Sequence, residues 1–72
     1  MNTIDAIRRM CDESGKSTTQ VSTEIGRTRS FVGSTLTRQS VPKANTLALI
    51  AQACGYRLVL ESDTDRIQID PD

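Results

Sequence analysis

The chain has 72 residues, of which 36% are hydrophobic and 25% are charged, and its formal net charge is zero. This balance is typical of one small folded domain and excludes an intrinsically disordered chain. No apolar run approaches the roughly 20 residues that a membrane-spanning helix needs, so we expect no membrane partner. The N-terminal stretch MNTIDAIRRMCDESG carries acids and arginines where a signal peptide has an apolar run, so we expect a cytoplasmic protein.

Residue types that support catalysis or metal binding are scarce. The chain has no histidine, and its only two cysteines are Cys11 and Cys54. This composition excludes the usual zinc finger and any histidine-dependent triad. Helical periodicity places the N-terminal acids on outward faces, where nothing pairs them with a nucleophile. We therefore predict a protein that is not an enzyme and that has no catalytic residue, no metal site and no cofactor.

The first predicted helix covers residues 3–14. Apolar residues recur at helical spacing from Ile4 to Cys11. Asn2 is a suitable N-cap, and Gly15 can end the helix in the left-handed conformation.

Two short helices are predicted next, joined by a tight turn. The run Ser17-Thr18-Thr19-Gln20 matches a capping box and opens a helix over residues 18–25, which Gly26 ends. Thr28 is the predicted N-cap of a following helix over residues 29–38. The pattern predicts a helix-turn-helix arrangement.

A fourth helix is predicted over residues 43–54, and then the apolar period changes to two. Alternating residues at 56–61 and 66–70 flank a polar four-residue turn, which is typical of a β-hairpin. The predicted fold class is therefore mainly α: a small helix-turn-helix bundle of four helices with a C-terminal β-strand or β-hairpin. We divide the chain into a domain at 1–55 and a C-terminal β segment with an acidic tail at 56–72.

Charge is distributed unevenly along the chain. Residues 25–60 contain no Asp or Glu, whereas residues 61–72 carry five acids and a single arginine. The basic residues of the acid-free stretch are Arg27, Arg29, Arg38, Lys43 and Arg57. A basic segment of this kind favours contact with nucleic-acid phosphates.

Two segments together carry a family resemblance. Residues 17–32 read STTQVSTEIGRTRSFV and residues 42–56 read PKANTLALIAQACGY. The chain resembles, without a gap from about Ser17 to Tyr56, the lambda-repressor-like (Cro/repressor-type, xenobiotic-response-element family) helix-turn-helix DNA-binding domains. It departs from them at Thr35, where the family usually has an apolar residue, and at Arg38, where the family often has a glycine. The resemblance implies double-stranded DNA as partner.

The second helix of such a pair lies in the major groove with its N-terminal residues at the base edges. The expected base contacts are Thr28, Arg29, Ser30, Phe31 and Ser34. Among them, Arg29 can bind both O6 and N7 of one guanine, whereas Phe31 either packs on a thymine methyl or is partly buried. The expected phosphate contacts are Thr18, Thr19, Arg38, Ser40 and Lys43.

The leading functional hypothesis is a sequence-specific transcriptional regulator, most simply a repressor. The alternatives are the DNA-binding antitoxin of a toxin–antitoxin pair, with a toxin protein as partner, and a protein-interaction module that kept the fold without binding DNA. We also predict a homodimer through the β segment, with Tyr56, Leu58, Val59 and Leu60 in the interface. The competing arrangement is a monomer whose hairpin folds back on its own helices.

Overall fold

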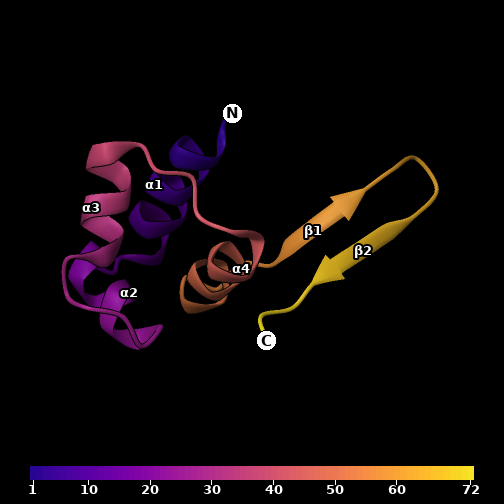
Figure 1. Cartoon of the computed structure of the whole chain (residues 1–72). Coiled ribbons are helices and arrows are strands. Elements are labelled where there is room, and N and C mark those ends of the chain that lie inside the picture. Colours follow the sequence, from indigo (N-terminus) through magenta and orange to yellow (C-terminus); the bar gives the residue numbers. More distant parts are fainter.

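The computed structural model describes residues 1–72 and contains four helices followed by two strands (Figure 1). The helices are α1 (Thr3–Ser14), α2 (Thr18–Glu24), α3 (Phe31–Arg38) and α4 (Ala44–Ala53), and the strands are β1 (Leu58–Glu61) and β2 (Arg66–Ile69). The predicted fold class, four helices with a C-terminal β-hairpin, is confirmed. None of the four helices has both the length and the apolar character needed to cross a membrane.

The first two helices begin at the caps that the sequence predicts. The Asn2 side chain accepts a hydrogen bond from the Asp5 amide at 2.8 Å, and the Ser17 hydroxyl accepts one from the Gln20 amide at 3.0 Å. Gly15 ends α1 with φ at 72°, a left-handed conformation that glycine adopts without a Cβ clash.

The start of α3 differs from the prediction. Thr28 is not its N-cap: the helix begins at Phe31, and Ser30 takes the N-cap position without a side-chain hydrogen bond. The carbonyl of Thr28 instead accepts the Phe31 amide at 3.0 Å, which extends the turn by two residues. The helix ends at Arg38, and the next residue, Gln39, has a φ of 54° in the left-handed region.

One apolar core holds the four helices together. Its fully or nearly fully buried members are Ile4, Ile7, Met10, Cys11, Val21, Val32, Leu36, Ile50, Ala51 and Cys54. Thr35 is also buried, and its hydroxyl donates to the Phe31 carbonyl at 2.9 Å, so this polar side chain is satisfied inside its own helix.

The two strands pair with each other in antiparallel register, Leu58 opposite Ile69 and Leu60 opposite Ile67. These four side chains share one face of the hairpin, which we call the apolar face. The base of the hairpin packs on α4, whereas its outer half projects away from the helices (Figure 1). Leu60 and Ile67, in that outer half, are 58% and 55% exposed.

Candidate nucleic-acid interface

A polar cleft lies between the first turn of α2 and the exposed face of α3. It has a volume of about 490 Å³ and no hydrophobic side chain in its lining. The lining residues are Thr18, Thr19, Arg29, Ser30, Gly33, Ser34, Thr37 and Arg38. Two arginines, hydroxyls and a glycine therefore share one concave surface without an acidic residue.

The cleft brings together six of the ten residues predicted to contact DNA. Three were expected at base edges and three at phosphates; they are Arg29, Ser30, Ser34, Thr18, Thr19 and Arg38. Of the other four, Thr28, Ser40 and Lys43 are exposed outside the cleft, and Phe31 is half-buried. Ser40 lies just beyond α3, where its amide donates to the Thr35 carbonyl at 3.1 Å, and Lys43 is the residue before α4.

The helices α2 and α3 lie close together at Gly33. A Cβ placed on it would lie 3.7 Å from the Thr18 hydroxyl oxygen, an ordinary van der Waals contact, so a methyl group fits there. The Thr18 hydroxyl and the middle of α3 are consequently near neighbours across the cleft.

A buried serine joins the two helices behind this surface. Ser22 is fully buried, and its hydroxyl donates to the Thr18 carbonyl at 2.7 Å and accepts the Val32 amide at 2.9 Å. Val32 is the second residue of α3, whose first amides have no partner within the helix. Ser22 therefore caps α3 from a different helix, a role that α3's own N-cap residue does not fill.

Phe31 is held from two sides at the start of α3. Its ring packs against the core, and the guanidinium carbon of Arg27 lies 4.7 Å from the ring centroid, within cation–π range. Arg27 also donates to the Thr46 hydroxyl at 3.3 Å, which links the turn before α3 to α4. Partial burial of Phe31, one of its two expected environments, is observed.

The arginines of the cleft carry no intramolecular ion pair. The chain forms two ion pairs, Lys16 with Glu24 at 3.1 Å and Arg66 with Glu61 at 3.6 Å. Glu24, the nearest acid in sequence before the turn, is thus neutralised by Lys16, whose ammonium also donates to the Ala53 carbonyl at 2.7 Å. The positive charges of Arg29 and Arg38 are thus not neutralised within the chain.

The roles of three residues of this region were not predicted from the sequence. Thr37 lines the cleft, and its spacing after Ser30 and Ser34 (i, i+4, i+7) was a visible signal that all three share one helix face. Arg27 and Ser22 carried no such signal, because their partners Phe31, Thr46 and Val32 depend on how the helices cross.

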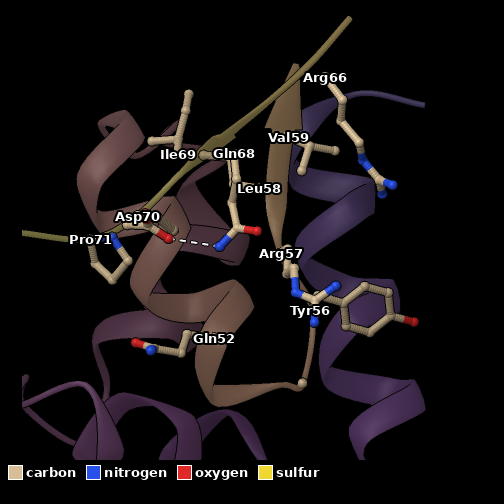
Figure 2. A pocket seen from close by; sticks show the side chains of 12 residues that line it. Gln52, Tyr56, Arg57, Leu58, Val59, Arg66, Gln68, Ile69, Asp70 and Pro71 are labelled. Atoms are coloured by element: carbon tan, nitrogen blue, oxygen red, sulfur yellow. Dashed lines mark hydrogen bonds between the residues drawn. The ribbon is translucent and has the colours of Figure 1, made fainter. Parts of the chain in front are cut away.

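The predicted dimer residues occupy the hairpin and the segment just before it. Leu60 and Tyr56 are exposed, whereas Leu58 and Val59 are half-buried. Ile67, which was not predicted, joins Leu60 on the apolar face. A hollow of about 580 Å³ lies where the base of the hairpin meets α4, with Arg57, Arg66 and Gln52 among its lining residues (Figure 2).

The two cysteines lie together in the core between α1 and α4, and both are free thiols. Burial raises the pKa of the Cys11 thiol from 9.0 to about 11, with smaller contributions from Cys54 and Asp12. This thiol is protonated at neutral pH, which is the behaviour of a packing residue rather than of a nucleophile.

Comparison of the chain with protein-family models, curated proteins and solved structures finds no match.

Proposed function

We propose that this chain is a sequence-specific DNA-binding transcriptional regulator that inserts α3 into the major groove. The observation that carries the proposal is the acid-free polar cleft, in which the exposed face of α3 and the start of α2 present two unpaired arginines and several hydroxyls together. Hydroxyls and arginines are the groups that contact base edges and phosphates in such interfaces.

Five residues of the cleft have a defined part in this proposal. Arg29, just before α3, donates two hydrogen bonds to one guanine, and Ser30 and Ser34 contact neighbouring base edges. Thr18 of α2 and Arg38, the last residue of α3, contact phosphates.

The regulator acts as a homodimer in this proposal. One helix of eight residues contacts few base pairs, and two-fold symmetric proteins of this class place two such helices in successive major grooves, about 34–36 Å apart. The exposed Leu60 and Ile67 supply an apolar surface for a second copy. Replacement of Leu60 by Asp is expected to yield a monomer of unchanged helicity, because this side chain adds little to its own chain's core.

The test of DNA binding is a fluorescence anisotropy titration against duplexes selected from a randomised library. We expect Arg29→Ala to lose roughly 1–3 kcal/mol on the selected duplex and much less on random DNA. The matched control is Arg9→Ala, which removes the same charge from the exposed face of α1, away from the cleft.

The outcomes separate the possible roles. Equal losses on selected and random duplexes would make Arg29 a phosphate contact. A failure of the wild-type protein to bind any duplex at low salt would overturn the proposal and leave a protein-interaction module as the function.

A further inference from the structure

A second hollow, which we call the apolar hollow, lies between α1, α4 and the segment that leads into β1. It has a volume of about 340 Å³, and seven of its nine lining residues are hydrophobic. Two of them, Met10 and Ala51, belong to the buried core, and two others, Leu47 and Leu58, are half-buried. The apolar hollow therefore extends from the surface of the molecule to its core.

The only charged residues in this lining are two arginines. Arg9 of α1 and Arg57, just before β1, are both exposed, and neither takes part in the chain's two ion pairs. Asp5, one turn before Arg9, and Asp70, which lines the neighbouring hollow with Arg57, lie outside this lining and form no ion pair. Figure 2 shows Arg57 and the ring of Tyr56 directed toward α1. Two guanidiniums thus border an apolar surface that has no acidic residue.

The size and chemistry of the apolar hollow define the kind of molecule that fits it. A water-sized group occupies about 30 Å³ in a liquid, so the hollow holds on the order of ten non-hydrogen atoms. This is the size of a small molecule. The hydrophobic lining favours an apolar body, and guanidinium groups donate charge-assisted hydrogen bonds to a carboxylate.

We infer that the apolar hollow binds a small amphipathic carboxylate. The hydrocarbon part of the ligand lies against Met10, Leu47 and Ala51. Its carboxylate accepts hydrogen bonds from Arg9 and Arg57 at the edge of the hollow. The hollow shares no residue with the polar cleft, so this inference depends on neither DNA binding nor dimer formation.

Two-dimensional NMR of the ¹⁵N-labelled full chain, titrated with sodium octanoate, tests the inference. The octanoate anion has about ten non-hydrogen atoms, which matches the volume. We expect saturable shifts of amides in α1, α4 and residues 56–58, with a dissociation constant on the order of 1 mM. Octylammonium has the same chain and the opposite charge, and butyrate has the same charge and a shorter chain. Each should bind at least about tenfold more weakly than octanoate.

Substitutions locate the two parts of the ligand. Arg9→Gln and Arg57→Gln should each weaken octanoate binding roughly three- to tenfold, because each removes one donor to the carboxylate. Arg8→Gln is the matched control: it removes the same charge from the adjacent position of α1, outside the lining, and should change the dissociation constant by less than about twofold. Ala6→Leu places a larger side chain in the lining while both arginines remain, and it should weaken binding at least about tenfold.

Each possible outcome supports or overturns the inference. The absence of saturable shifts at about 20 mM octanoate, or shifts confined to other parts of the chain, would overturn the site. Equal affinity for octanoate and octylammonium, or unchanged affinity in both arginine variants, would overturn the recognition of a carboxylate. Unchanged affinity in Ala6→Leu would overturn the placement of the hydrocarbon part. Thermal melts followed by circular dichroism establish that each variant is folded, and anisotropy with DNA tests the regulatory function separately.

Discussion

Ser22→Ala tests the cap that α2 provides for α3. The substitution removes the hydroxyl that accepts the Val32 amide at 2.9 Å and leaves that amide buried without a partner. An unsatisfied buried donor costs about 1–3 kcal/mol. The Thr18 carbonyl contributes little to this loss, because it still accepts the backbone hydrogen bond of its own helix. We therefore expect the free energy of unfolding to fall by about 2 kcal/mol and the Tm to fall by about 8–16 °C.

Urea and thermal unfolding followed by circular dichroism measure this loss. Ser34→Ala is the matched control, since Ser34 is half-buried on α3 and its hydroxyl forms no intramolecular hydrogen bond. It should change the free energy of unfolding by less than about 0.5 kcal/mol. A Ser22→Ala protein as stable as the control would refute the role of the hydroxyl as a cap.

Three further predictions concern the cleft and the core. Gly33→Ala should stabilise the protein by about 0.5–1 kcal/mol in urea unfolding, because alanine loses less backbone entropy than glycine when the helix forms. The added methyl fits, since it lies 3.7 Å from the Thr18 hydroxyl oxygen, and a loss of stability would mean that this space is too tight. The raised pKa of Cys11 means that the unfolded chain loses this thiol proton more readily than the folded chain, so the free energy of unfolding should fall as the pH rises from 9.0 to about 11. Cys11→Ala should show a smaller fall of the urea midpoint over that pH range. Arg38→Ala and Lys43→Ala should each flatten the slope of log DNA affinity against log salt by about one unit, and unchanged slopes would exclude phosphate contacts.

The parts of the fold that depend on neighbouring residues could be predicted from the sequence. Asn2 and Ser17 cap the amides three residues later, and both caps are present as predicted. The alternation of the C-terminal residues and the short polar turn between the two runs predicted a hairpin, and the two strands pair in this way. In both cases the interacting residues are close in sequence, so their spacing along the chain determines the contact.

The start of α3 could not be predicted, because it depends on a contact between helices. Thr28 and Ser30 are both acceptable N-caps by type, and nothing local distinguishes them. In the structure the Val32 amide, in the first turn of α3, donates to the hydroxyl of Ser22, ten residues earlier, instead of to an N-cap side chain. The position of Arg27 against Phe31 has the same origin, because it depends on how the turn lies over the core.

The length of α3 has a consequence for how the cleft can be studied. The helix has eight residues, includes a glycine, and lacks a side-chain cap of its own. A segment of that size does not overcome the entropic cost of helix nucleation in water, so a peptide covering residues 28–40 will be unstructured. The helical state of α3 is thus conditional on the folded state of the remaining chain. Under the proposed function, substitutions far from the cleft that unfold part of the population are expected to lower the apparent DNA affinity in proportion to the folded fraction, without altering any contact to the duplex.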